Sequence, residues 1–226
     1  MKFSAVSNLW CRFFIIQIMS IMKKVLLSMA ALLVATITFG QVQWGIVAGP
    51  QFSSIQTRNL GLSNNREATR LVTNLRAGFT VDIPFAPGCY IGTGILYSGK
   101  GGKFKNSDVR ANISYLEAPI QFMYKPDVGY GRMVLAVGPY VAVGVGGKVK
   151  NTAFGSLDIY NDEALLMRQK RFDSGASVGV GYELPVGLFF GLNGDIGLVN
   201  TAYYTDNDRK FHNYSFGVSV GYKFGR

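Results

Sequence analysis

The C-terminal stretch from Tyr214 to Phe224 alternates strictly between two kinds of side chain. Its even positions are large and apolar, namely Tyr214, Phe216, Val218, Val220, Tyr222 and Phe224. Its odd positions are small or polar, namely Ser215, Gly217, Ser219, Gly221 and Lys223. Because successive side chains of a β-strand point to opposite faces, this pattern predicts a strand with one apolar face and one thin, polar face. The apolar face must then pack against a protein core or against lipid.

The same alternation recurs along the chain and divides it into eight expected strands. They cover approximately residues 43–55, 71–84, 89–99, 113–125, 132–147, 171–184, 187–201 and 211–224. Long polar connections alternate with tight turns that contain most of the prolines. An even number of strands with this loop pattern is typical of an up-and-down transmembrane β-barrel. We therefore predict an all-β, eight-stranded antiparallel barrel with both termini at the short-turn end.

The distribution of charge decides which face meets lipid. None of the positions on the expected apolar faces is charged, and a Lys or Arg near the bilayer midplane costs about 2–4 kcal/mol in such barrels. The opposite faces carry Arg76, Asp82, Glu117, Asp173, Glu183 and Asp195. A soluble eight-stranded carrier barrel would reverse this arrangement, so the pattern favours a barrel with an apolar exterior.

Aromatic residues on the expected outward faces form two groups. One group falls near the short-turn end and the other near the long-loop end: Trp44, Tyr124, Tyr182 and Tyr222, then Phe52, Tyr97, Phe172 and Tyr214. The two groups are separated by roughly 20–25 Å for tilted strands, close to the height of an outer-membrane apolar band. This spacing predicts two lipid-facing girdles at the membrane interfaces.

The first forty residues read as an export signal. Residues 22–40 begin with Lys23 and Lys24, continue as an apolar run, and end in small residues before an expected cut ahead of Gln41. Residues 1–21 are interpreted as an over-extended start, or else as a leader extension. The remaining residues, 41–226, form the barrel domain, which we expect in the outer membrane of a Gram-negative bacterium after secretion to the periplasm.

Composition excludes several function classes. The formal net charge is +10, but four of the basic residues precede residue 41, which leaves about +6 for the barrel domain. No basic helix or finger motif accompanies this charge, so we expect no nucleic-acid partner. No metal-ligand cluster, phosphate loop or paired-carboxylate motif appears, and we expect no cofactor, no metal and no catalysis.

Two stretches resemble known outer-membrane proteins. The last strand is similar to the closing strand of bacterial outer-membrane barrels, although Gly225 and Arg226 follow its final aromatic. That resemblance implies a signal for the barrel insertion machinery, made by Phe216, Val218, Val220, Tyr222 and Phe224. The segment Tyr115-Leu-Glu-Ala-Pro-Ile120, together with the Gly-rich strands and the leader, resembles the PorT family of outer-membrane β-barrel proteins. The founding member's part in a secretion and surface-attachment machine suggests an accessory role in envelope assembly.

The expected lumen contains charged residues of both signs that could form ion pairs across the barrel. Arg76, Glu117, Asp173 and Asp195 lie on inward faces, and an eight-stranded barrel is only wide enough for its own side chains to fill it. We expect a self-satisfied buried charge network, since unpaired buried charges are costly. The alternative is a proton or small-solute path, which would make the protein a narrow channel or a small-ligand-binding barrel.

The long-loop end carries the remaining candidates. His212 is the only histidine, and with Ser215 or Asp208 it defines a less favoured hypothesis, a rim-located lipid-modifying or hydrolytic enzyme. The long loops are basic, with Arg58, Arg66, Arg70, Lys100, Lys103, Lys105, Arg110, Lys148, Lys150, Arg168, Lys170, Arg209 and Lys210. Such loops suit outer-membrane lipid and lipopolysaccharide phosphates, or an acidic envelope protein partner. We therefore predict a structural or interaction barrel.

Overall fold

The structure is a computed structural model, and it describes residues 42–58, 66–104, 109–151, 155–160, 168–203 and 210–225. The expected signal peptide at 22–40, the preceding 1–21, and the candidates Lys105, Asp208 and Arg209 lie outside the described residues. Within the described ranges, no helix is long and apolar enough to cross a membrane.

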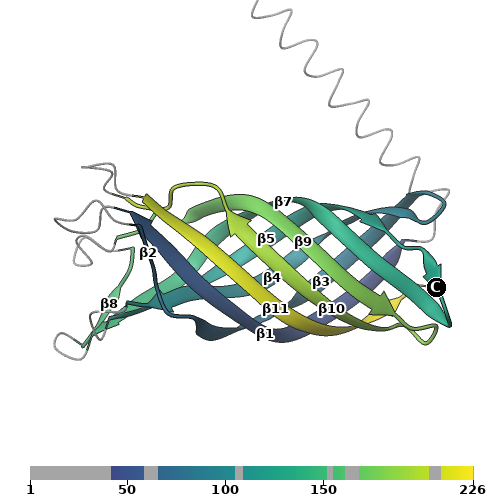
Figure 1. The fold of residues 1–226 in the computed structure, drawn as a ribbon, viewed down its shortest axis with the longest axis horizontal. Coiled ribbons are helices and arrows are strands. Elements are labelled where there is room, and N and C mark those ends of the chain that lie inside the picture. The colour runs from purple at the N-terminus through teal and green to yellow at the C-terminus, as the bar shows by residue number, and fades with distance from the viewer. Residues whose placement is uncertain are drawn as a thin grey trace, which may run out of the picture. The chain divides into compact units, whose positions relative to one another are not determined.

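Eight long antiparallel strands form a closed barrel (Figure 1). They are β1 (Gln43–Arg58), β3 (Val72–Ala86), β4 (Cys89–Lys103), β5 (Arg110–Tyr124), β7 (Gly131–Asn151), β9 (Phe172–Glu183), β10 (Leu188–Gly197) and β11 (Lys210–Phe224). Each pairs with the next along the chain, and β11 pairs with β1 to close the sheet. The predicted eight-stranded, up-and-down antiparallel barrel is therefore confirmed. The short strands β2 (Arg66–Ala68), β6 (Asp127–Val128) and β8 (Gly155–Asp158) flank it.

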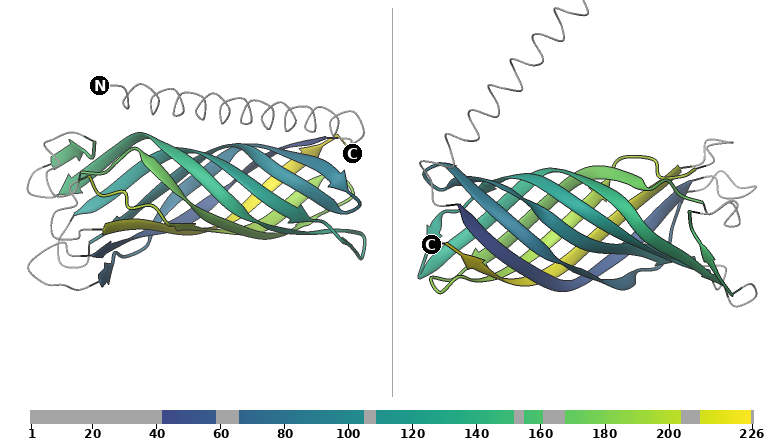
Figure 2. Two further views of the ribbon diagram at one scale, coloured as in Figure 1. Left: turned by 90° about the horizontal axis from the view of Figure 1, so that it is seen from above. Right: turned by 180° about the vertical axis from the view of Figure 1, so that it is seen from behind.

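The two ends of the barrel differ. Tight turns lie at one end, together with the C-terminus, and the strand ends at Arg58, Lys103, Asn151 and Lys210 lie at the other (Figure 2). Gly88 and Gly187 sit in two of these tight turns with φ of 71° and 89°, a left-handed conformation that glycine adopts without steric cost. We call the tight-turn end the periplasmic end and the opposite one the outer end.

The alternation of side chains separates the two surfaces of the barrel. Along β11 the even positions from Tyr214 to Phe224 are exposed, whereas five of the six odd positions from Asn213 to Lys223 are buried, Gly221 being half-buried. Apolar residues cover the outside of the other strands as well, for example Phe79, Ile120 and Leu192, which are 68%, 54% and 57% exposed. The apolar side chains thus face outward, and the buried interior is largely polar.

A separate apolar core lies at the outer end. It is formed by Ile55, Ala111, Ile113, Tyr115, Tyr140, Ala142, Val149, Ile159, Tyr160, Ala202 and Phe211, which we call the outer apolar core. Strands β1, β4, β5 and β7 run farther toward this end than the alternation predicts. Residues 168–171 and 200–203 continue the wall, since Gln169 pairs with Ala202 and Thr201 N donates to Phe211 O at 3.0 Å. The described residues of the outer end are therefore folded and packed together.

Candidate functional site

Five charged side chains meet in the lumen, between its midpoint and the outer end of the barrel. Arg76 contacts Glu117 at 3.0 Å and Asp195 at 2.6 Å. Lys100 contacts Glu117 at 3.0 Å and Asp173 at 3.4 Å. We call this group the outer ionic cluster. Its two cations and three carboxylates are all buried, so each is stabilised by its partners rather than by water.

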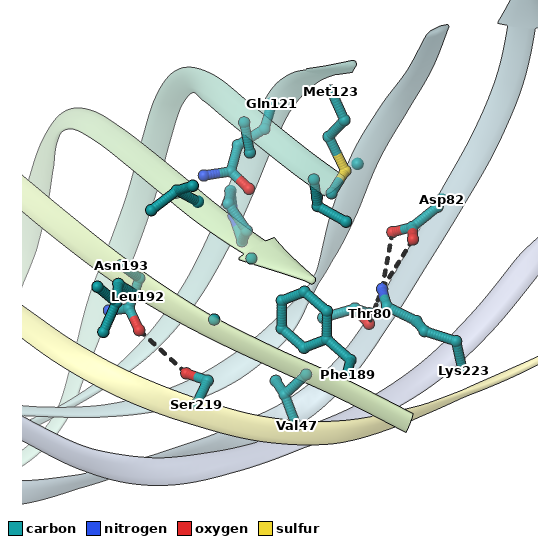
Figure 3. A pocket seen from close by; sticks show the side chains of 18 of the residues that line it. Val47, Thr80, Asp82, Gln121, Met123, Phe189, Leu192, Asn193, Ser219 and Lys223 are labelled. Carbon is teal, nitrogen blue, oxygen red and sulfur yellow. Dashed lines mark hydrogen bonds and ion pairs between the residues drawn. The ribbon is translucent and has the colours of Figure 1, made fainter. Parts of the chain in front are cut away.

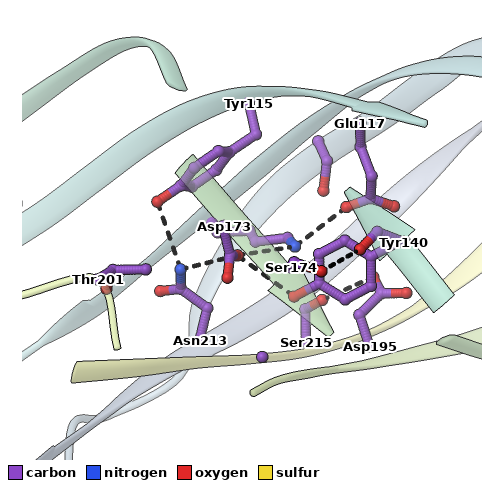
Figure 4. Close-up of polar contacts among 12 residues, drawn as sticks. Tyr115, Glu117, Tyr140, Asp173, Ser174, Asp195, Thr201, Asn213 and Ser215 are labelled. Atoms are coloured by element: carbon purple, nitrogen blue, oxygen red, sulfur yellow. Dashed lines mark hydrogen bonds and ion pairs between the residues drawn. The ribbon is translucent and has the colours of Figure 1, made fainter. Parts of the chain in front are cut away.

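Neutral polar groups complete this cluster (Figure 4). Asp195 accepts hydrogen bonds from Ser177 at 2.7 Å and Ser215 at 3.0 Å. Asp173 accepts from Asn213 Nδ2 at 3.0 Å and from the hydroxyl of Tyr140 at 3.3 Å. These donors come from three different strands, so the cluster ties β7, β9 and β11 together across the barrel.

Lys100 also lies against aromatic rings. Its Nζ is 4.0 Å from the centroid of the Tyr140 ring and 5.5 Å from that of Tyr115. A cation over an aromatic face is attracted by the ring quadrupole, most strongly where water is excluded. Tyr140 and Tyr115 also belong to the outer apolar core, so Lys100 joins that core to the outer ionic cluster.

A second group of charges closes the periplasmic side of the lumen. Lys125 Nζ contacts Asp82 at 2.7 Å and Glu183 at 3.1 Å. Lys223 contacts Asp82 at 2.8 Å, and Arg132 contacts Glu183 at 2.9 Å. We call these five residues the periplasmic ionic cluster. Its three cations and two carboxylates complement the opposite imbalance of the outer ionic cluster.

A small cavity is lined by Arg76 of the outer ionic cluster and by Asp82, Lys125 and Lys223 of the periplasmic ionic cluster. Figure 3 shows this cavity from close by. Its volume is about 100 Å³, which is enough to hold water. Glycines at inward positions leave this space, and Phe189 and Met123 line it. Asn193 accepts from Ser219 at 3.0 Å, while its buried Nδ2 has no hydrogen-bond partner among the described residues. The cavity wall is mainly apolar, and among its polar groups Asn193 Nδ2 is a donor that no described residue satisfies.

The predicted network residues come together in part. Arg76, Glu117 and Asp195 are in direct contact, whereas Asp173 joins them through Lys100. The expectation that Lys100 is a solvated loop residue is wrong, because its side chain is 1% exposed inside the barrel. Gly99 and Gly101 occupy the positions where the outward series of large apolar residues in β4 would continue. The alternating pattern therefore ends near residue 99, although β4 continues to Lys103.

The periplasmic ionic cluster was only partly visible in the sequence. Asp82 and Glu183 belong to the predicted inward set, whereas Lys125, the last residue of the expected strand 113–125, does not. It lies directly after β5 and is 2% exposed. The parity of β5 could have found it, since residue 125 continues the inward series of residues 115 to 123.

The residues of the rim-enzyme hypothesis do not meet. Ser215 points into the lumen, where it donates to Asp195. His212 lies on the opposite face of β11, where its Nδ1 is 3.2 Å from Gly197 O and its side chain lines a surface groove of about 240 Å³ with Arg58 and Tyr214. An even and an odd position of one strand cannot share a face, so these two side chains form no catalytic pair. Asp208, the other candidate partner, is not among the described residues.

The predicted girdle residues all lie on the outside. Trp44, Tyr124 and Tyr222 are 59%, 45% and 41% exposed at the periplasmic end, with Tyr182 half-buried. Tyr97, Phe172 and Tyr214 are 40%, 50% and 37% exposed toward the outer end, with Phe52 half-buried against Phe216. The closing-strand residues Phe216, Val218, Val220, Tyr222 and Phe224 are exposed too.

Tyr160 packs into the outer apolar core beyond the membrane-spanning strands. Its ring lies 4.3 Å from the Arg171 guanidinium, and its buried hydroxyl has no hydrogen-bond partner among the described residues. Burial raises the pKa of Tyr160 to about 12, with Arg171 acting in the opposite direction. Across the described ranges, no group of three or more His, Cys, Asp or Glu side chains is arranged to hold a metal ion.

The closed sheet, the apolar exterior and the charged, filled lumen define the class of this protein. It is an eight-stranded β-barrel of the outer membrane of Gram-negative bacteria. The chain belongs to the outer membrane protein beta-barrel domain family, whose model matches residues 35–203. No curated protein matches the chain.

Several solved barrels are similar in outline. Ail, the attachment invasion locus protein of Yersinia pestis, is 10% identical, with a TM-score of 0.44 over 82% of this chain and 100% of that chain. OprG of Pseudomonas aeruginosa is 12% identical, with a TM-score of 0.45 over 81% and 96%. The outer membrane enzyme PagL is 14% identical, with a TM-score of 0.42 over 76% and 98%. Likeness at this level says nothing about what the chain does.

Proposed function

We propose that the protein is a non-catalytic, non-conducting barrel that anchors a folded outer end for interaction with an envelope protein. Within its family, the Tyr115–Ile120 segment supports a member near the PorT proteins, and therefore an accessory role in secretion or envelope assembly. Of this segment, Tyr115 and Glu117 point inward and are fully buried, where Glu117 pairs with Arg76.

One observation carries this proposal, namely that the lumen is filled along its length. Two ionic clusters and the outer apolar core occupy it, and about 100 Å³ is left between the clusters. A filled lumen leaves the outer end as the surface where a partner can bind. The described residues of that end pack around the outer apolar core.

Affinity capture tests the interaction role. A tag inserted between residues 161 and 167 leaves the described strands intact, and the chain is purified from detergent-solubilised outer membranes. The expected result is one envelope protein that co-purifies in near-stoichiometric amount. The same tag on an unrelated eight-stranded barrel is the control. A chain that purifies alone, or with the same proteins as the control, contradicts the proposal.

A second candidate function, a small-ligand-binding barrel, is favoured by the cavity and the orphaned Asn193 Nδ2. Gly179 lines this cavity, and a Cβ built there would meet the nearest atom, Ala136 Cβ, at an ordinary 3.5 Å. A Cβ therefore fits at this position without a close contact, and the longer side chain of Gly179→Leu would occupy cavity space. If the cavity binds a ligand, a small molecule that co-purifies with the unchanged protein is lost from Gly179→Leu and retained by Gly179→Ala. Equal retention in both variants would remove this candidate.

The rim-enzyme hypothesis is tested separately. His212→Ala is expected to leave the lipid composition of the envelope unchanged, because its ring faces away from Ser215. Mass spectrometry of extracted lipids from matched strains is the measurement. A lipid species that accumulates only in the variant would make the protein an enzyme.

A further inference from the structure

Four basic residues lie in one row across the outer end of the barrel. The strand register places Arg70 opposite Lys103, Lys103 opposite Arg110, and Arg110 opposite Lys150. At the end of the row, Lys150 faces Ser156 of β8. We call these four residues the outer cationic row.

All four side chains project from the outer surface of the wall. The residues next to them in sequence, Thr69, Ala111 and Val149, are buried inside. Because neighbouring residues of a strand point to opposite faces, the row points outward. Arg70, Arg110 and Lys150 are accordingly exposed, and Lys103 is half-buried.

The register sets like charges against each other. Directly opposite residues of an antiparallel pair have Cβ atoms about 4.5–5.5 Å apart, and like charges at that separation destabilise the sheet. Arg110 Nε donates to Asn112 Oδ1 at 3.1 Å, which positions its guanidinium without neutralising it. Lys103 makes a further interaction within the chain, whereas Arg110 and Lys150 lie directly opposite each other. A bound anion with several charges would relieve this repulsion.

The height of the row selects the kind of anion. Val145, an exposed apolar residue of β7, precedes Lys150 by five residues, which is about 13 Å in height for a strand tilted near 40°. The row therefore stands above the hydrocarbon, at the level of charged headgroups. Lys and Arg side chains have long stems that lie along apolar surface and place their charge at such an interface.

We propose that the outer cationic row binds the phosphate groups of a phosphorylated glycolipid of the outer leaflet, of the lipopolysaccharide type. Arg110 supplies a planar fork that suits phosphate oxygens, and Lys150 beside it supplies a compact positive charge. This site is independent of the proposed protein partner, because it faces sideways from the wall toward the surrounding lipid.

Binding of bis-phosphorylated lipid A to the purified full chain in a zwitterionic detergent tests the site. Lys150→Gln is expected to weaken binding about fivefold, and the Arg110→Gln, Lys150→Gln double variant about twenty-fivefold. Lys170→Gln removes one exposed lysine of the outer end that is outside the row, and should change binding less than twofold. Lipid A without phosphates should bind weakly and equally to every variant.

Heat stability provides a readout that a purely structural role would not reproduce. Without lipid A, the double variant should resist heat at least as well as the unchanged protein, because a repulsion is removed. With lipid A, the unchanged protein should gain more stability than the double variant. The proposal is overturned if Lys150→Gln and Lys170→Gln weaken binding equally, or if phosphate-free lipid A binds as well. Binding of a soluble sulfated polysaccharide at the row, without binding of lipid A, would also overturn it in favour of a glycan-docking surface.

Discussion

The Lys100 side chain, on the inward face of β4, stabilises three buried groups. It contacts Glu117 and Asp173 and lies over the Tyr140 ring. Its partners come from β5, β9 and β7, so the ammonium group links four strands. Removing one partner of a buried ionic group leaves the others without compensation, which costs far more than removing a solvated charge.

Lys100→Met is expected to lower the free energy of unfolding by about 3–5 kcal/mol, because Glu117 loses one of its two cations and Asp173 loses the cation that contacts it. Urea unfolding of the barrel in lipid vesicles measures this difference. Lys170→Met, the same change at an exposed position, should stay within about 0.5 kcal/mol. An equally small effect at Lys100 would place its side chain in solvent, as the loop interpretation had it.

Tyr160 provides a second test at the residue scale. Tyr160→Phe removes a buried hydroxyl that has no partner among the described residues, so it should be neutral or slightly stabilising. Tyr160→Ala removes a ring from the outer apolar core and should cost about 3–5 kcal/mol. Limited proteolysis of the outer end is the measurement. Equal cleavage of the Phe and Ala variants would contradict the packing described for this ring.

The same residue gives the outer end a pH dependence. Burial raises the pKa of the Tyr160 hydroxyl from 10.0 to about 12, so the folded state holds its proton more tightly than the unfolded state. The stability that this group contributes is fully present below pH 10 and is lost as the pH rises toward 12. Protease resistance of the unchanged protein should therefore fall more steeply over that range than that of Tyr160→Phe. Parallel profiles would show that Tyr160 is not buried in the folded protein.

At the scale of elements, the strands followed from alternation because the outside of the barrel is continuously apolar. The expected strand 71–84 corresponds to Val72–Ala86, and 211–224 to Lys210–Phe224. The differences gather at the outer end, where β7 runs to Asn151 and β4 to Lys103. There the outward positions carry glycine or basic residues instead of large apolar ones. The strands therefore continue past the last residue that the apolar alternation can identify.

The outward face of β11 is predicted to tolerate charge differently at different depths in the membrane. Val218 lies midway between the aromatic residues Tyr214 and Tyr222 on the outward face. Val218→Arg should cost about 2–4 kcal/mol, whereas Tyr214→Arg, near the interface, should cost about 0–1 kcal/mol. Urea unfolding in vesicles distinguishes them. Equal costs at the two depths would mean that this face does not meet lipid.

At the scale of the whole molecule, the inward carboxylates and Arg76 were predictable, but the cations Lys100, Lys125 and Arg132 that pair with them were not. Parity alone placed Arg76, Glu117 and Asp195 inside. Contacts such as that between Lys125 and Asp82 join residues 43 positions apart in sequence, and they depend on the shear of the closed barrel. The cavity was also invisible, because it results from several inward glycines on different strands facing one another.

Single-channel recording of the purified full chain in planar bilayers tests whether the lumen is sealed. The two ionic clusters and the outer apolar core predict that insertion, verified by protease protection of the barrel, produces no stable conductance steps. A porin reconstituted in the same bilayer is the positive control. Reproducible steps from the inserted chain, unchanged by repurification, would contradict the sealed lumen and favour a channel.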